Sequence, residues 1–155
     1  MQSHVSVMKS IFKVGLSKKM EGTVEFDFIE GDTTCTLSPY FKIHEGKEEE
    51  WKANSKHFFE LTKTEKDVVY FGFSYSDDGQ VHCREAYKSG AATLHHLKNV
   101  DSPLNSALKI ANLTRLEFHG PKSEVEHVRE DLTPLGCIFF TTDEACFKNK
   151  SIYKS

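Results

Sequence analysis

Three side chains suited to proton transfer lie on neighbouring elements of this sequence. His96 stands in a helical stretch that begins at Ser89, and Glu85 and Tyr87 share one face of a strand expected over residues 81–87. Neutral imidazole accepts a proton near neutral pH, because its unperturbed pKa is about 6.5. A carboxylate on a buried strand face is either paired or keeps a raised pKa. These residues predict general acid–base chemistry with His96 as the base.

Each of these residues also has an interpretation without chemistry. His96 is equally consistent with a half-buried helix histidine that has no task. Glu85 is consistent with a salt bridge to an arginine such as Arg84 of a neighbouring strand or Arg115. Tyr87 is suited either to a hydrogen bond with a substrate oxygen or to packing at a dimer seam.

A second set of residues predicts the walls of a pocket for an aromatic ligand. Trp51, Phe58 and Phe73 supply large aromatic surfaces, and Asn54 and His57 lie on or near the same face of the helix expected over residues 47–65. A helical stripe of aromatic residues is also typical of an ordinary core. Both interpretations stay open at this stage.

Several kinds of site are disfavoured by the absence of their motifs. The sequence has no CxxC, HxH or HxxxH pair, and the adjacent His82 and Cys83 must point to opposite faces of a strand, so three or four metal ligands do not converge. It also lacks GxSxG, Walker and GxGxxG motifs. We expect no metal and no cofactor.

The composition predicts one soluble α+β domain. The chain has 155 residues, of which 38% are hydrophobic and 28% charged, and its net charge of −3 disfavours a nucleic-acid partner. No apolar run approaches the roughly 20 residues that a membrane span needs.

Cysteine usage points to a reducing compartment. The four cysteines, Cys35, Cys83, Cys137 and Cys146, are scattered and read as free thiols of a cytoplasmic protein, with a two-disulfide secreted domain as the alternative. The first 20 residues contain four lysines and no acid, which resembles a weak organellar presequence and leaves organellar targeting open.

Hydrophobic periodicity predicts the order of the elements. Strands are expected over residues 23–30, 34–43, 68–75, 81–87 and 113–120, with helices over 47–65, 89–99, from 101 onward and over 123–132, and a short strand at 137–140. Pro39 predicts an edge position or a bulge in its strand. The turn Asp77-Asp78-Gly79 is a strong hairpin signal.

From residue 34 the order β, α, β, β, α, β is typical of a ferredoxin-like fold, an antiparallel sheet with helices on one face. We expect residues 1–33 to form an N-terminal extension that adds a strand or β-hairpin, residues 34–140 to form the domain and residues 141–155 to form a polar tail. The uncovered face of the sheet is expected to hold large Phe and Tyr side chains, which predicts a homodimer formed through that face.

The stretch from Tyr40 to about Phe118 resembles the antibiotic-biosynthesis monooxygenase family of dimeric α/β-barrel proteins. The likeness lies in the segments FKIHEGKEEEWKANSKHFFELTKTE, YFGFSYSDDGQVHCREAYKS and LHHLKNV with the later LTRLEFHGP. The resemblance implies a homodimer whose sheets form a shared barrel, with a pocket in each subunit between sheet and helices.

The resemblance also implies a site and a reaction. The family's acidic-aromatic segment matches Glu85 and Tyr87, and its recurring histidine matches His96, with Asn99 after it. Oxygenase members of the family hold an electron-rich phenol or quinol whose anion reacts with dioxygen without metal or flavin. His96 would then be the base, Glu85 its orienting partner and Tyr87 a polar contact to a small apolar or aromatic ligand.

Two departures disfavour haem degradation. Pro39 stands where haem-degrading members have an asparagine, and Tyr87 stands where they have a tryptophan. Haem binding is therefore a weaker alternative. A non-catalytic ligand-binding or stress-associated dimer is the main rival. An open pocket of a few hundred Å³ that His96, Glu85 and Tyr87 face would favour the enzyme, and a cavity filled by Phe side chains would favour the rival.

Overall fold

The computed structural model describes residues 28–29, 33–143 and 148–149, and its centre is a five-stranded sheet. The strand order is β3 (Val68–Tyr75), β4 (Gln80–Tyr87), β2 (Cys35–Ile43), β5 (Ala111–Gly120) and β6 (Ile138–Thr141). All neighbouring strands are antiparallel except β5 and β6, which are parallel. The first four strands have the ferredoxin-like arrangement, so the predicted α+β fold class is confirmed.

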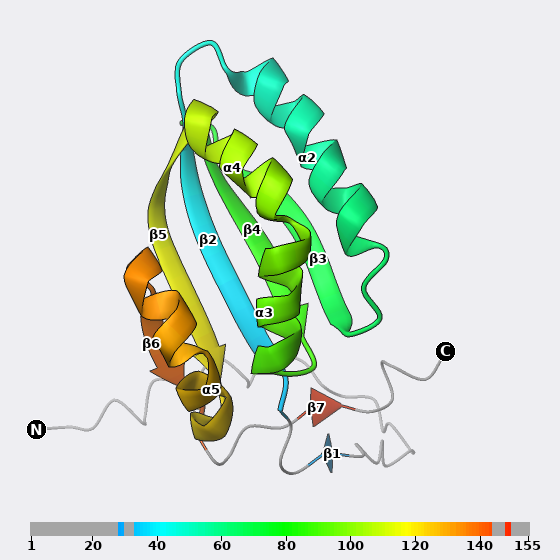
Figure 1. The fold of residues 1–155 in the computed structure, drawn as a ribbon. Helices are drawn as coiled ribbons and strands as arrows, with labels where there is room; N and C mark the ends of the chain where they lie inside the picture. Colours follow the sequence, from blue (N-terminus) through cyan, green and yellow to red (C-terminus); the bar gives the residue numbers. More distant parts are fainter. Residues whose placement is uncertain (1–27, 30–32, 144–147, 150–155) are drawn as a thin grey trace, which may run out of the picture.

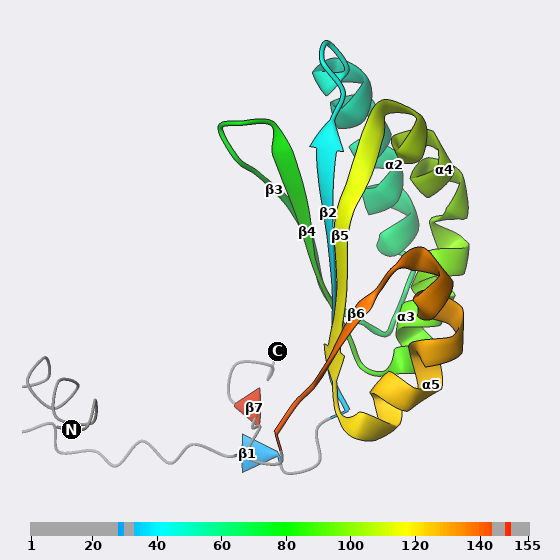
Figure 2. The ribbon, with the colours of Figure 1, turned by 90° about the vertical axis from the view of Figure 1, so that its left-hand side faces the viewer.

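Four helices cover one face of this sheet and leave the other face open (Figures 1 and 2). They are α2 (Glu48–Thr62), α3 (Gly90–Asn99), α4 (Asp101–Ile110) and α5 (Lys122–Leu132), and the short 3₁₀ helix η1 (Thr133–Leu135) follows α5. The last connection lets β6 return parallel to β5, as a crossover through a helix allows.

Local signals explain where the helices begin. Three glutamates, Glu48 to Glu50, occupy the first turn of α2, where the helix dipole favours negative charge. The hydroxyl of Ser89 caps α3 by accepting a hydrogen bond from the backbone N–H of Ala92 at 3.2 Å. At Val100, between α3 and α4, the backbone leaves the helical range (φ −95°, ψ 11°), so the two helices are separate segments.

Pro39 was predicted to lie either at an edge of the sheet or at a bulge, and the structure excludes the edge position. Strand β2 lies in the middle of the sheet between β4 and β5, so Pro39 is not at an edge. The pairing of β2 with β4 reaches Leu37 and resumes at Tyr40, while the register with β5 shifts between Tyr40 and Phe41. The sheet therefore tolerates the missing N–H of proline beside a bulge.

A separate two-stranded sheet joins the two ends of the described chain. Strand β1 (Phe28–Ile29) pairs antiparallel with β7 (Lys148–Asn149). The rest of the strand expected over residues 23–30 and most of the segments 1–33 and 144–155 lie outside the described residues. The division into extension, domain and tail stays a prediction.

The largest core side chains lie between the sheet and the helices. Phe71 and Phe73 of β3 are on this side, where their rings make edge contacts with Phe59 and Phe58 respectively. The fully buried core comprises side chains such as Leu37, Trp51, Val81, Tyr87, Phe118, Val125, Val128 and Leu132.

The open face is consequently less apolar than expected, because period-two alternation places both β3 phenylalanines on the helix side. It carries mixed polar and aromatic pairs. Tyr40 stacks on His82 with ring centroids 4.3 Å apart, and His119 stacks on Phe140 at 4.5 Å. The expectation that large Phe side chains crowd this face is therefore wrong, although Tyr40 and Phe140 remain there.

The start of α3 is packed so closely against α5 that it has no room for a methyl group. A Cβ on Gly90 would lie 2.7 Å from Val128 Cγ1 and 3.1 Å from the carbonyl oxygen of Glu124. We expect Gly90→Ala to lower the free energy of unfolding by about 1–3 kcal/mol, measured by urea denaturation. Gly72→Ala is the control, because its nearest neighbour is the exposed Tyr70 hydroxyl, and an equal loss there would contradict the packing argument.

Candidate active site

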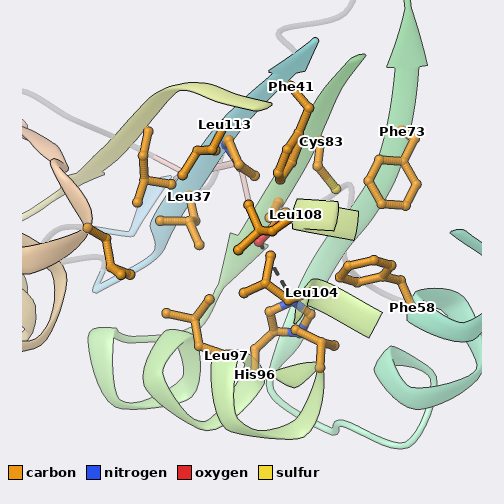
Figure 3. Close-up of a pocket in the computed structure, with 15 residues that line it drawn as sticks. Leu37, Phe41, Phe58, Phe73, Cys83, His96, Leu97, Leu104, Leu108 and Leu113 are labelled. Carbon is orange, nitrogen blue, oxygen red and sulfur yellow. Dashed lines mark ion pairs between the residues drawn. The ribbon is translucent and has the colours of Figure 1, made fainter. Parts of the chain in front are cut away.

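A cavity of about 90 Å³ lies between the sheet and helices α2, α3 and α4. Its polar lining is confined to the carboxyl of Glu85, the imidazole of His96 and the thiol of Cys83 (Figure 3). The other lining residues are apolar: Leu37, Pro39, Phe41, Phe58, Phe73, Leu97, Val100, Leu104, Leu108, Leu113, Leu116 and Leu135.

The imidazole of His96 is held between two carboxyl groups. Its Nδ1 lies 3.0 Å from Oε1 of Glu65, which follows the end of α2, and its Nε2 lies 3.8 Å from Oε2 of Glu85 on β4. The side chains of His96, Glu65 and Glu85 are only 2%, 3% and 6% exposed. A carboxylate only accepts hydrogen bonds, so Nδ1 donates to Glu65 and the neutral ring keeps its lone pair on Nε2, on the Glu85 side.

Asn99 fixes the carboxyl of Glu65. Its Nδ2 donates to Glu65 Oε1 at 2.8 Å and to the carbonyl oxygen of Leu61 at 3.1 Å. Asn99 stands three residues after His96 on α3, so both side chains reach the same carboxyl from one helix face. Asn99, which the family resemblance pointed to, therefore contacts Glu65 and does not line the cavity.

Burial sets the protonation of both groups at the cavity. It lowers the pKa of His96, although the neighbouring Glu65 opposes that change. Burial raises the pKa of Glu85 to about 7, despite the hydrogen bonds from Tyr87 and Cys83 that favour its charged form. At neutral pH the site thus holds a neutral imidazole beside a carboxyl group whose pKa is raised toward neutrality.

Tyr87 lies behind Glu85 and is not among the residues that line the cavity. Its hydroxyl donates to Glu85 Oε2 at 2.6 Å. Burial also raises the pKa of Tyr87 above its ordinary value, so the phenol stays a neutral donor. In this structure Tyr87 holds Glu85 in place.

Only some of the predicted substrate-binding residues line the cavity in the structure. Phe58 and Phe73 line the cavity. Trp51 packs behind them, 5.9 Å from the ring of Phe73, and its indole N–H finds no hydrogen-bond partner within the described part of the chain. Asn54 donates to the carbonyl oxygen of Pro103 at 2.8 Å and so ties α2 to α4, whereas His57 is exposed on the outer side of α2.

Glu65 is the residue that sequence reasoning missed. It was expected near the end of a helix, with no sign of a partner 31 residues away. The available signal was topological, because the ferredoxin-like plan lays the two helical layers side by side on one face of the sheet.

No group of three or more His, Cys, Asp or Glu side chains in residues 33–143 is placed to hold a metal ion. None of the helices in that range is long and apolar enough to cross a bilayer.

Glu65 should control the titration of His96. We expect Glu65→Gln to lower the pKa of His96 further, because the substitution removes a neighbouring negative charge and keeps the side-chain size. The measurement is an NMR titration of the histidine ring resonances. Glu60→Gln, on the exposed side of α2, is the control, and an unchanged His96 titration in Glu65→Gln would contradict the pairing.

Comparison with known proteins yields structural matches only. No family model matches the chain, and no curated protein matches it. The structure of MupZ from Pseudomonas fluorescens is similar at 36% sequence identity and a TM-score of 0.71, over 76% of this chain and 96% of that protein.

Two more distant structures share the fold. A candidate antibiotic biosynthesis monooxygenase from Nitrosomonas europaea is 16% identical with a TM-score of 0.53, over 59% of this chain and 92% of that one. A protein of unknown function from Bacteroides thetaiotaomicron, described as a possible oxidoreductase, is 13% identical with a TM-score of 0.51, over 56% of this chain and 96% of that one.

Proposed function

Since this chain belongs to the same family as MupZ from Pseudomonas fluorescens and shares its fold with candidate antibiotic biosynthesis monooxygenases, we propose that its cavity carries out acid–base chemistry on a small, uncharged and largely apolar substrate. The proposed reaction is cofactor-independent oxygenation of a phenol or quinol. The observation that carries the proposal is the orientation of His96, whose Nδ1 is held by the buried Glu65 while Nε2 is directed toward Glu85 at the cavity.

The first proposed step is proton transfer from the substrate hydroxyl to His96 Nε2. The carboxylate of Glu65 stabilises the imidazolium that forms, as an anionic partner does in a buried site. The apolar walls leave the substrate anion poorly solvated, and this favours electron transfer from the anion to dioxygen. Within this proposal Glu65 and Glu85 share the role of orienting partner that was predicted for Glu85 alone.

The proposed oxygenation needs no reactant besides the substrate and dioxygen for its atoms and electrons to balance. A ring carbon that carries two hydrogens in the keto tautomer loses both and gains one oxygen atom as a carbonyl. The second oxygen atom leaves as water with those two hydrogens. Glu85, with a pKa of about 7, is placed to return a proton to the departing oxygen.

The direct test is oxygen uptake by the metal-free protein with a panel of quinols, anthrones and flavonoids. Under ¹⁸O₂ the product should contain one labelled oxygen atom, and a chelator should leave the rate unchanged. If no compound in the panel is consumed faster than in buffer alone, the proposed reaction is wrong.

One observation favours a second candidate function, binding without turnover. The cavity of about 90 Å³ is smaller than the roughly 300–1,000 Å³ of most ligand sites, and the hydroxyl of Tyr87 is already bonded to Glu85. If the protein only binds its ligand, adding that ligand should raise the melting temperature of the protein, and no product should form.

We also propose that two copies associate through the open face of the sheet. The face presents stacked pairs, and Glu117 there is nearly buried between Arg115 and His119 even in the single chain. Sedimentation at micromolar concentration should give about twice the chain mass of 17.7 kDa. A single 17.7 kDa species would contradict this assembly.

A further inference from the structure

The size of the cavity restricts what can occupy it. An engineered cavity of roughly 150 Å³ holds a benzene molecule. The cavity beside His96 measures about 90 Å³, so a ring bound there must displace a wall or extend beyond it. Seven of the fifteen lining residues are leucines, and none of the fifteen is a lysine or an arginine.

The outer wall of the cavity is formed by partly exposed leucines. Leu108 on α4 is 45% exposed and Leu135 at the end of η1 is 51% exposed. Gly136 follows Leu135 with a positive φ of 72°, and the described backbone there makes a turn rather than a buried strand. Rotating the Leu135 side chain outward therefore displaces no fully buried group.

A second hollow of about 430 Å³ lies next to the cavity. It shares Leu97 and Leu135 with the cavity, and it runs between α3 and the end of α5. Its remaining lining combines an aliphatic base with a charged rim: Leu94, Leu132, Lys98, Asp101 and Asp131. The two spaces are thus separated by the side chains of Leu97 and Leu135.

We infer that the substrate of this site is a phenol or quinol that carries an unbranched alkyl tail. The hydroxyl head lies at His96 and Glu85, and the tail passes between Leu97 and Leu135 into the hollow between α3 and α5. Leucine side chains give a tail apolar contact along this path, and the cavity that holds the head group has no lysine or arginine among its lining residues, which disfavours an acidic head group. This inference rests on the proposed function, since it names the substrate class of that site.

Binding of 4-alkylphenols, from 4-methylphenol to 4-heptylphenol, tests the inference by calorimetry. Each methylene that enters an apolar space should tighten binding about fourfold, which corresponds to about 0.8 kcal/mol per buried CH₂. Affinity should therefore rise along the series. If it stays flat or falls once the ring is filled, the inference is wrong.

Leu135→Trp places a bulky ring on the path without disturbing a buried side chain. This variant should lose the dependence of affinity on chain length. It should still bind the shortest phenol. Ile138→Trp is the matched control, because Ile138 is similarly exposed at 47%, lies three residues further on and lines neither space. Equal chain-length dependence in both variants would overturn the assigned path.

Failure of this inference and failure of the proposed function are distinguishable. Affinity that grows with chain length in the absence of oxygen uptake supports the binding path and contradicts the oxygenation. Turnover of compact quinols without any gain from an alkyl tail supports the oxygenation and overturns the inferred substrate class.

Discussion

Replacing His96 with glutamine is expected to reduce oxygen uptake about 10²–10⁴-fold with any substrate that the wild-type protein turns over. Glutamine is close in size and keeps a group that can donate to Glu65, but it has no basic nitrogen for the substrate proton. The loss should appear in kcat rather than in KM, because the substrate contacts are mainly apolar.

The matched control for this prediction is His57→Gln, which changes a histidine that is exposed on α2 and does not line the cavity. Its activity should equal that of the wild type. Far-UV circular dichroism and phenol binding would establish that His96→Gln remains folded. Unchanged turnover in a folded His96→Gln protein would remove the histidine from the mechanism.

Replacing Glu85 with glutamine is expected to stabilise the protein selectively at alkaline pH. Burial raises the pKa of this carboxyl from 4.5 to about 7, so the folded state holds a proton that the unfolded state releases between these values. The wild type therefore loses stability as pH rises from about 4.5 through 7, by roughly 3 kcal/mol in total. Glutamine remains neutral and avoids this loss.

Urea unfolding at pH 5 and pH 8 measures the effect as a difference between the two proteins. The lowered pKa of His96 acts in the opposite direction, adding stability as pH rises toward 6.5, but both proteins share that contribution. Glu85→Gln should gain roughly 2–3 kcal/mol relative to wild type between the two pH values. The exposed Glu130→Gln is the control, and the same pH-independent offset in both variants would show that Glu85 is ionised without cost.

The property of Glu85 that favours catalysis also lowers the stability of the protein. A carboxyl with a pKa near neutrality exchanges protons readily, yet its ionised form is costly in an apolar cavity. Tyr87 and Cys83 reduce that cost, because both provide hydrogen bonds to the carboxyl. A variant that is more stable at pH 8 and less active would be the expected consequence of this arrangement.

The alternation of apolar and polar residues was sufficient to determine the fold class. Residues 68–75 and 81–87 alternate with period two around the turn at Asp77, and the chain folds there as the β3–β4 hairpin. These signals are local, because strand alternation and turn chemistry act over a few residues. His96 and Glu85 were identified from residue type together with the resemblance to the antibiotic-biosynthesis monooxygenase family.

The role of Pro39 depended on the neighbours of its strand. A single strand contains no information on whether it will lie at an edge or in the centre, and proline favours an edge. Strand β2 is central because the connections through α2 and through α3–α4 place β4 and β5 on either side of it. The face on which Phe71 and Phe73 lie was decided in the same way, by the register of β3 against β4.

The sequence by itself determined the order of the elements from residue 34 to residue 140. Residue type and the family resemblance together identified the histidine and the carboxyl group at the cavity. Only the tertiary structure determined that Glu65 orients His96, that Tyr87 lies behind Glu85 and that Leu97 and Leu135 separate two hollows. The physical reason is distance along the chain. Local patterns fix which face of an element is buried, whereas a hydrogen bond between residues 31 positions apart exists only after two elements have packed together.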